Sequence, residues 1–326
     1  MRKMHKTMLA AGLFTLCCAA GAAHAQGSAV WPSKAVHLNV AFAPGGPVDI
    51  IARILGPKLT EYLGQPMVID NRPGAGGNVG TVYVAKSAPD GYNVLLTSSA
   101  YAVNVSLFSN PGYDPDRDLI PVAVVASQPN LIVVNAALPV KNIPELVAYV
   151  KAKPSAFATP GSGTTPHLTG ENFYNLQLKL GMTAIHFRGA GPAVAATVGN
   201  EPSFGSMALS APLPFVRSGR LRALAVSSAQ RLPFLPEVPT LNELGYPNMQ
   251  DYTWVGVFVP AGTPPAVVQK LNEAINRAIQ SADVKEHLAL QAFDAAGGTP
   301  QQFSDYVKTE VVKWAKVVQE TGAKPD

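Results

Sequence analysis

Three segments of this 326-residue chain place glycine beside hydroxyl or charged side chains directly after an apolar run. The first reads Phe42-Ala43-Pro44-Gly45-Gly46-Pro47-Val48-Asp49. Glycine lets the backbone approach a ligand closely, and the unpaired amides at a helix start favour an anion. We expect this loop to bind a carboxylate, although α/β proteins also use such a turn without a ligand. A fixed Asp49 carboxylate would repel an anion unless hydrogen bonds engage its oxygens, so we interpret Asp49 as shaping the loop.

The second segment offers hydroxyls and amides before another predicted helix. It reads Thr159-Pro160-Gly161-Ser162-Gly163-Thr164-Thr165-Pro166-His167. Simple capping would account for Thr164 and Thr165, and a structural hydrogen bond would account for His167. Because the chain holds two such loops, we predict that both contribute to one binding site.

The third segment, Phe187-Arg188-Gly189-Ala190-Gly191-Pro192, ends a predicted strand and opens a predicted helix. Arg188 could pair with a carboxylate through two hydrogen bonds, although exposure to solvent is the commoner fate of an arginine. Two further groups follow predicted strands, where open α/β sheets place their ligands. They are Ser98, Ser99, Ala100 and Tyr101, and then Ser127 and Gln128.

Signatures of catalysis are weak. The run from Gly74 to Gly80 resembles a dinucleotide-binding loop, but its third glycine comes one residue late and Asp90, the acidic partner by position, falls in a turn. No nucleophile elbow, zinc-protease helix or phosphate-binding loop with lysine occurs. The histidines after the leader lack metal-ligand spacing. We therefore predict a protein that is not an enzyme and has no metal or cofactor. A hydrolase would require His167 against Ser162 or Thr164.

The first 25 residues are typical of a secretory signal peptide. Arg2, Lys3 and Lys6 precede an apolar run that ends in the small-residue stop Ala23-His24-Ala25. Both cysteines, Cys17 and Cys18, lie inside this leader, so no disulfide is expected after cleavage near Ala25. Without the three leader cations, 22 Lys and Arg oppose 21 Asp and Glu, which excludes a basic surface for nucleic acid. We expect a periplasmic protein.

The order of predicted elements favours α/β architecture. Apolar runs at 36–42, 67–70 and 93–98 alternate with helical patterns at 49–63 and 78–87. Strands at 122–126 and 131–134 follow each other without a helix, which indicates a passage between two lobes. Strands around 157, at 184–187 and at 221–226 alternate with helices at 143–151, 166–180 and 192–198. After a strand at 254–259, helices at 264–280, 284–291 and 300–320 are expected to pack back on the first lobe.

Several motifs together resemble the Bug receptors, the extracytoplasmic solute receptors of tripartite tricarboxylate transporters. The resemblance covers nearly the whole chain after the leader. It rests on the first loop with Asp49, Asn71-Arg72-Pro73-Gly74-Ala75-Gly76-Gly77, Asp90-Gly91-Tyr92, Tyr113-Asp114-Pro115, Gly161-Ser162-Gly163 with His167-Leu168, Ser218 to Val226, Pro239-Thr240 with Glu243 and Gly245, and Pro260 to Pro264.

The resemblance implies a two-lobed periplasmic-binding-protein fold of the Venus flytrap, type II-like kind. Each lobe would be a mainly parallel sheet flanked by helices, with lobe 1 formed by residues 26–127 plus 251–326 and lobe 2 by residues 128–250. It implies that a carboxylate is held by backbone amides and ordered waters from the loops at Ala43 to Pro47 and Gly161 to Thr165. A two-subunit membrane permease would be the partner of a monomeric receptor.

Two segments depart from the family pattern. Phe187-Arg188-Gly189 stands where the family usually has Pro-Tyr-Lys-Gly, and Gly199 to Phe204 replaces a common Gly-Gly-x-Val-Asp. The remainder of the ligand therefore cannot be inferred from the family, and the extra cation at Arg188 predicts a second acidic group on it. The alternatives to a transport receptor are a sensor receptor that docks on a signalling protein and a periplasmic hydrolase.

Overall fold

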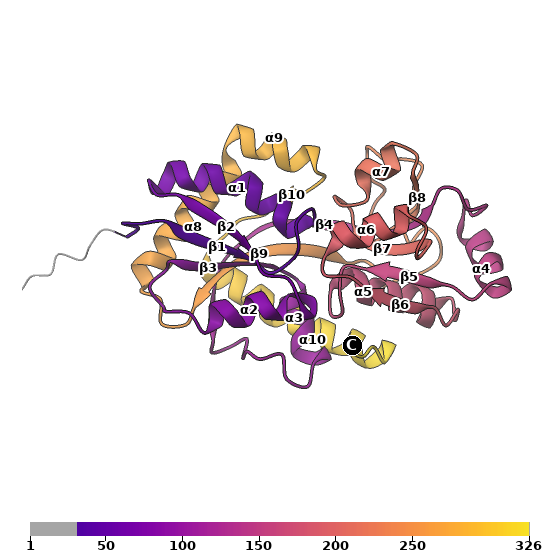
Figure 1. The fold of residues 1–326 in the computed structure, drawn as a ribbon, viewed down its shortest axis with the longest axis horizontal. Helices are drawn as coiled ribbons and strands as arrows, with labels where there is room; N and C mark the ends of the chain where they lie inside the picture. Colours follow the sequence, from indigo (N-terminus) through magenta and orange to yellow (C-terminus); the bar gives the residue numbers. More distant parts are fainter. Residues whose placement is uncertain (1–30, 326) are drawn as a thin grey trace, which may run out of the picture.

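The computed structural model describes residues 31–325, so the predicted signal peptide lies outside the described residues. Figure 1 shows two α/β halves side by side, joined by long strands. The strands of the first half run in the order β2 (Met67–Asn71), β1 (Val36–Val40), β3 (Asn93–Ser98), β9 (Tyr252–Pro260) and β4 (Leu119–Asn135), with the short β10 (Asp294–Ala295) on β4. The second half contains β4, β7 (Phe204–Ala208), β5 (Ala156–Thr159) and β6 (Thr183–His186), with β8 (Leu221–Val226) also on β4.

The sheets are parallel away from their junction and antiparallel at it. Strand β1 is parallel to β2 and β3, and β5 is parallel to β6 and β7, as the alternation of strands and helices predicts. The pairs β3–β9, β4–β9, β4–β7 and β4–β8 are antiparallel. The α/β class is thus confirmed. Each sheet is mixed and not mainly parallel, because β4 crosses from one half to the other and runs antiparallel to its neighbours in both, and the chain returns to the first half at the start of β9.

Strand β4 corrects the prediction of two separate strands at 122–126 and 131–134. It is one strand of 17 residues, which pairs with β9 up to Pro129 and with β7 and β8 from Asn130 and Leu131 onward. Proline has no N–H for a sheet ladder, so Pro129 indicates a strand break in the sequence. The chain tolerates it because β4 changes partners at this point.

Helices cover both faces of each sheet. Around the first sheet these are α1 (Pro47–Leu63), α2 (Asn78–Ala85) after the 3₁₀ turn η1 (Ala75–Gly77), α3 (Ala100–Leu107), α8 (Pro265–Gln280), α9 (Ala282–Leu290) and α10 (Pro300–Thr321). Around the second they are α4 (Ile143–Ala152), α5 (Thr165–Gly170) with the π-helical continuation η2 (Glu171–Gln177), α6 (Ala190–Val198) and α7 (Leu213–Arg217).

The sequence patterns did not predict α3, α7, β7, the two-residue β10 or the 3₁₀ turn η1. The α3 sequence contains two β-branched valines, which lower helix propensity, so no helix was expected there. Strand β7 reads FGSMA, with no β-branched residue, yet all five of its residues are buried. Burial between β4 and β5 makes this segment a strand, and that burial depends on contacts distant in sequence.

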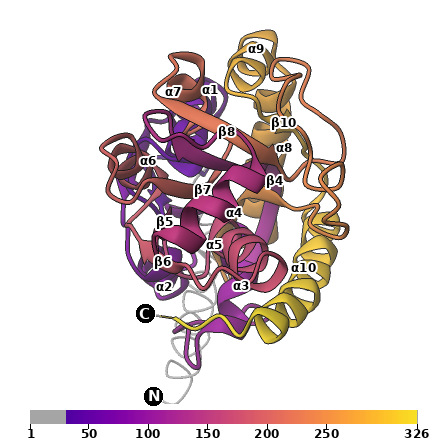
Figure 2. The same cartoon turned by 90° about the vertical axis from the view of Figure 1, so that its right-hand side faces the viewer.

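The hydrophobic core divides as the sheets do. One cluster fills the first half and includes Leu271, Leu288, Phe303 and Trp314 from the last three helices, which confirms that these helices pack on the first half. Two smaller clusters lie in the second half. Helix α10 also contacts α5 and η2, so it runs along the edge of both halves (Figure 2). Among the described residues no helix is both long and apolar enough to cross a membrane.

Candidate functional site

The loop of residues 43–47, before α1, touches the start of α6 in the other half. The amide of Ala43 donates to the carbonyl of Arg188 over 3.1 Å. A Cβ atom added to Gly191 would lie 2.6 Å from the carbonyl oxygen of Pro44, and one added to Gly189 would lie 3.2 Å from Ala43. Glycine is required here because two backbones meet. The structure therefore joins the first and third segments that the sequence singled out.

A second contact joins the glycine-rich turn before α2 to the loop before α5. A Cβ on Gly76 would overlap the carbonyl oxygen of Ser162, and one on Gly163 would overlap Oδ1 of Asn104 in α3. The hydroxyl groups of Ser99 and Thr165 lie 3.1 Å apart. The loops of the two sheets are therefore closed on one another.

Between these contacts lies a small cavity of about 20 Å³. That volume is enough for about one or two water-sized spheres. Its walls from the first half are Phe42, Gly46, Pro47, Val48, Ser98 and Thr253, and those from the second half are Pro160, Thr164, Pro166, Ala190 and Ala208. Ser98 and Ala208 are the last residues of β3 and β7, and Pro160 directly follows β5, which is where open α/β sheets place ligands.

A larger side cleft of about 490 Å³ adjoins this cavity, because Phe42 and Pro160 line both. The side cleft is also lined by Gly74 to Gly77, Gly161, Ser162, His186, Phe187 and Arg188. Arg188 is exposed, and its guanidinium makes no hydrogen bond or ion pair within residues 31–325. The Ser162 hydroxyl is buried and has no hydrogen-bond partner among the described residues. Arg188 is therefore accessible to a polar ligand in the side cleft, whereas the Ser162 hydroxyl is enclosed by protein.

Asp49, in the first turn of α1, bonds to the loop before it, to its own helix and to the end of β2. Its carboxylate accepts the amide of Gly45 at 3.0 Å, Nε and Nη2 of Arg53 at 2.9 Å each, and Nδ2 of Asn71 at 3.1 Å. Burial alone would raise the pKa of Asp49, but the hydrogen bonds from Arg53, Gly45 and Asn71 outweigh it and lower that pKa. Asp49 thus shapes the loop, as we interpreted it from the sequence.

The capping and structural roles considered for Thr164 and His167 are present. Oγ1 of Thr164 accepts the amide of His167 at 3.3 Å and donates to the carbonyl of Gly161 at 2.8 Å. Nδ1 of His167 accepts the amide of Gly163 at 3.2 Å. Burial, helped by the neighbouring His186, lowers the pKa of His167 to about 3, so its ring is neutral. No hydrogen bond joins this ring to the hydroxyl of Ser162 or Thr164 in the described residues, as a hydrolase would need.

The remaining predicted residues divide between the cavity and the scaffold. Ser98 lines the cavity, and its Oγ accepts the amide of the buried Ala100 at 3.3 Å. Ser127 and Gln128 were expected to follow a strand, but they lie within β4. The side chain of Gln128 is hydrogen-bonded to Ser210: it donates to Oγ of Ser210 at 3.0 Å and accepts the amide of Ser210 at 2.6 Å. The strand-end argument for these two residues was therefore wrong.

Sequence reasoning missed Thr253, Gly76 and Asn104. Thr253 is the second residue of β9, one residue before the predicted strand, and it lines the cavity. Asn104 is buried in α3, and its Nδ2 donates to the carbonyl of Gly76 at 3.1 Å and to Oδ1 of Asn78 at 2.7 Å. An asparagine within the apolar run AYAVNV was the available signal.

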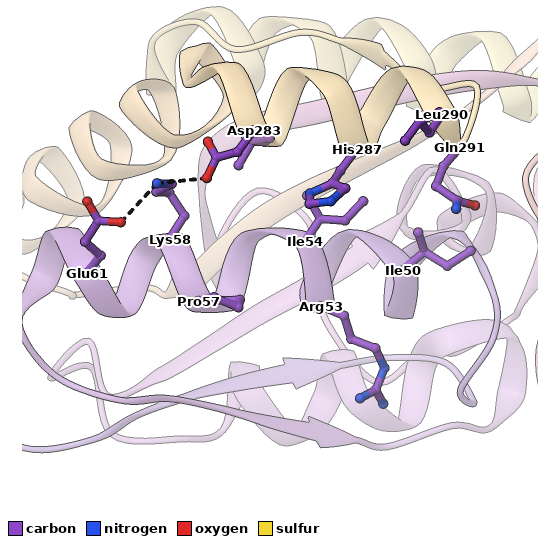
Figure 3. Close-up of a pocket in the computed structure, with 11 residues that line it drawn as sticks. Ile50, Arg53, Ile54, Pro57, Lys58, Glu61, Asp283, His287, Leu290 and Gln291 are labelled. Atoms are coloured by element: carbon purple, nitrogen blue, oxygen red, sulfur yellow. Dashed lines mark hydrogen bonds and ion pairs between the residues drawn. The ribbon is translucent and has the colours of Figure 1, made fainter.

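Another hollow, of about 510 Å³, lies away from the loops between α1 and α9 (Figure 3). Its polar lining is largely neutralised, since Lys58 pairs with Glu61 at 3.0 Å and with Asp283 at 2.9 Å. No strand end or glycine-rich loop reaches it. In residues 31–325 no group of three His, Cys, Asp or Glu side chains is placed to hold a metal ion. We therefore place the candidate site between the two sheets.

Comparison with known proteins gives the family. The model of the tripartite tricarboxylate transporter family receptor matches residues 51–323. The chain belongs to this receptor family. The protein BugT of Bordetella pertussis is 40% identical to the receptor over 327 residues, which cover 98% of this chain and 99% of BugT. The resemblance to Bug receptors inferred from the motifs is thereby confirmed.

Solved structures share the receptor fold. A protein of R. palustris solved with adipate has 33% identity and a TM-score of 0.86, and the match covers 91% of this chain and 100% of that one. MatC from Rhodopseudomonas palustris, solved with bound malate, has 32% identity and a TM-score of 0.83, covering 88% of this chain and 100% of MatC. The predicted periplasmic-binding-protein fold is therefore confirmed.

Proposed function

We propose that this receptor captures a small carboxylate between two lobes and delivers it to a membrane permease. Lobe 1 would be residues 26–127 plus 251–326 and lobe 2 residues 128–250, moving about the crossing of β4 and β9. The observation that carries the proposal is the meeting of glycine-rich loops from both sheets around one cavity, with Gly46 on one side and Thr164 on the other. The adipate and malate bound to the two solved relatives support a carboxylate ligand.

The proposed contacts follow from the chemistry of the walls. Backbone amides at the starts of α1, α5 and α6 would hold a carboxylate, since helix N-termini favour anions. The cavity of about 20 Å³ is smaller than such a ligand, so the lobes must part to admit it. Binding then stabilises the closed arrangement only through the ligand's preference for it over the open one.

We further propose that the receptor is exported to the periplasm, acts as a monomer and transfers its ligand to a permease of two subunits. A receptor that holds its ligand without turnover needs no catalytic pair. The neutral His167 and the unpaired Ser162 hydroxyl agree with that role.

A thermal-shift screen tests the proposal. Malate, adipate, monocarboxylates, tricarboxylates and amino acids would be added singly to the purified protein. A ligand at a hundredfold excess over Kd raises stability by about 2.7 kcal/mol, which is readily seen as a rise in Tm. We expect at least one carboxylate to give such a rise and its uncharged amide to give none. Equal shifts with the acid and its amide would contradict carboxylate recognition.

A further inference from the structure

An uninterrupted series of hydrogen bonds links a buried carboxylate at the β4–β9 crossing to the contact between the two halves. Ser99 lies 3.1 Å from Thr165, Thr165 lies 2.7 Å from Thr253, and Thr253 donates to Oδ1 of Asn130 over 2.9 Å. Asn130 in turn donates to Oδ1 of Asp251 over 2.6 Å. We call these five residues the hydroxyl chain. All five are buried, and Thr253 lines the cavity.

The direction of each bond in the hydroxyl chain is fixed by its Asp251 end. A carboxyl oxygen accepts the Asn130 amide hydrogen, so the Oδ1 of Asn130 must accept from Thr253. Each hydroxyl has a single hydrogen to donate. Thr165 must therefore donate to Thr253, and Ser99 must donate to Thr165. Asp251 thus sets the direction of these hydroxyl bonds through Asn130, from the far side of the crossing.

The hydrogen bonds of the Thr169 hydroxyl favour the protonated form of Asp251. Oγ1 of Thr169 lies 2.9 Å from the carbonyl of Thr165 and 2.7 Å from Oδ2 of Asp251. It also accepts from Nδ2 of Asn130 at 3.1 Å. One hydroxyl hydrogen cannot serve both the carbonyl and an ionised carboxylate. If Asp251 is protonated on Oδ2, it donates to Thr169, and Thr169 donates to Thr165.

We propose that Asp251 is a positioning residue of the ligand site, which as the neutral acid holds Asn130 and Thr169 and through them aligns Thr165 and Thr253 for closure. This inference rests on the proposed function, because it assigns the control of closure in that same site.

The surroundings of Asp251 favour the neutral acid. Its hydrogen-bond partners are uncharged, with Ser227 donating to its backbone carbonyl at 2.7 Å in addition to Asn130 and Thr169. Lys313 in α10 is the cation whose field reaches it. Burial raises the pKa of Asp251 to about 6, against the lowering effects of Thr169, Asn130, Ser227 and Lys313. Closure and ligand affinity are therefore expected to weaken as the pH rises toward 6 and beyond.

Three variants separate positioning from a merely structural role. Asp251→Asn supplies an amide that donates to Thr169 and an oxygen that accepts from Asn130, so it reproduces the neutral acid without titrating. Thr253→Val removes the hydroxyl in the middle of the hydroxyl chain, at the residue that lines the cavity, while keeping the side-chain shape. Glu310→Gln is the control, because Glu310 is a buried carboxylate that accepts from Trp254 beside Thr253 and lies outside the hydroxyl chain. It frees Lys313 from an ion pair of 3.6 Å, which can only lower the pKa of Asp251 and leaves that group titrating.

The first measurement is calorimetric titration with malate and with adipate at pH 5 and pH 7.5. Asp251→Asn should bind as the wild type does at pH 5. At pH 7.5 the wild type and Glu310→Gln should bind several-fold more weakly than Asp251→Asn, because only Asp251 can ionise at this position and one titrating proton changes affinity by at most tenfold per pH unit. Thr253→Val should bind at least about tenfold more weakly at both. Titration of the ligand itself is common to all variants and cancels in the comparison.

The second measurement needs no ligand. Small-angle scattering should show a radius of gyration that increases from pH 5 to pH 7.5 for the wild type and Glu310→Gln but stays constant for Asp251→Asn. Equal pH responses of the wild type and Asp251→Asn in scattering would overturn the positioning role, even if neither malate nor adipate bound. A different result is possible, in which no carboxylate binds but the scattering difference is present. That result would contradict the proposed function and would still support the control of closure by Asp251.

Discussion

At the scale of single residues, a few side chains act on the site without lining its cavity. Asp49 is the clearest case, because it makes no contact across the cleft and still fixes the amide of Gly45. Arg188 is the opposite case, an exposed cation with no ion-pair partner among the described residues. Asp49 sets the shape of the loop before α1, and Arg188 presents a positive charge to the side cleft.

Asp49→Ala is expected to weaken binding of a carboxylate by about tenfold while the protein stays folded. The change removes the acceptor for Gly45, and a hydrogen bond to a charged group contributes roughly 1.5–3 kcal/mol. Arg53→Ala is the control, since it removes the half-exposed partner and leaves Gly45 and Asn71 bonded to Asp49. Calorimetry on both variants checks this. Unchanged affinity in Asp49→Ala would remove Asp49 from any role in the site.

Arg188→Ala is expected to weaken dicarboxylates more than monocarboxylates. Arg188 lines the side cleft next to the cavity, where a second acidic group on the ligand would meet an unpaired guanidinium. A matched pair such as adipate and hexanoate, titrated into the wild type and the variant, isolates that second group. If both acids lost affinity equally, Arg188 would act through general charge and not through a specific contact.

At the scale of elements, the proposed closure depends on turns that meet backbone to backbone. The turn before α2 supplies one such contact, because Gly76 packs against the carbonyl of Ser162 from the loop before α5. Any side chain there would hold the two loops apart. The predicted effect is on closure and not on the folding of either half.

Gly76→Ala should therefore lower ligand affinity by at least about tenfold, the equivalent of 1.4 kcal/mol. Gly64→Ala is the matched control, since Gly64 at the end of α1 also has a positive φ, 72° against 60°, but an added Cβ meets nothing within 4 Å. Both variants carry the strain of a left-handed residue, so both lose some stability in urea unfolding. Only Gly76→Ala should lose affinity, and equal binding by the two would rule out this contact as a requirement for closure.

At the scale of the whole molecule, the sequence predicts the loops but not their partners. Glycines after apolar runs identify the segments at 43–47, 161–165 and 187–191, because a turn between strand and helix has a local signature. The contact of Gly189 with Ala43 and of Gly76 with Ser162 depends on how two sheets face each other, which no local pattern encodes. The same holds for β7, a strand only because β4 and β5 enclose it, and for Asp251, whose partners lie in β4 and α5.

Asp251 and His167 both make the stability of the fold depend on pH. The folded-state pKa of Asp251, about 6, is above its unfolded value of about 3.9, so its contribution is fully present below pH 4 and is lost as the pH rises to 6. His167 acts in the opposite sense, because its folded-state pKa of about 3 is below its unfolded value of about 6.5. Its contribution is lost as the pH falls from 6.5 toward 3. Between pH 4.5 and 5.5 the two slopes nearly cancel.

Asp251→Asn should remove that cancellation. With only His167 left of the pair, the unfolding free energy of the variant should rise relative to that of the wild type by about 1.4 kcal/mol per pH unit between pH 4 and 6. Above pH 6 the difference should become constant at roughly 3 kcal/mol, because the wild type then buries an ionised carboxylate and the variant does not. Urea unfolding of both proteins at half-unit steps from pH 4 to 8 measures the difference directly. Parallel profiles would show that the pKa of Asp251 is the same in the folded and the unfolded protein, since a group that titrates alike in both states gives no slope.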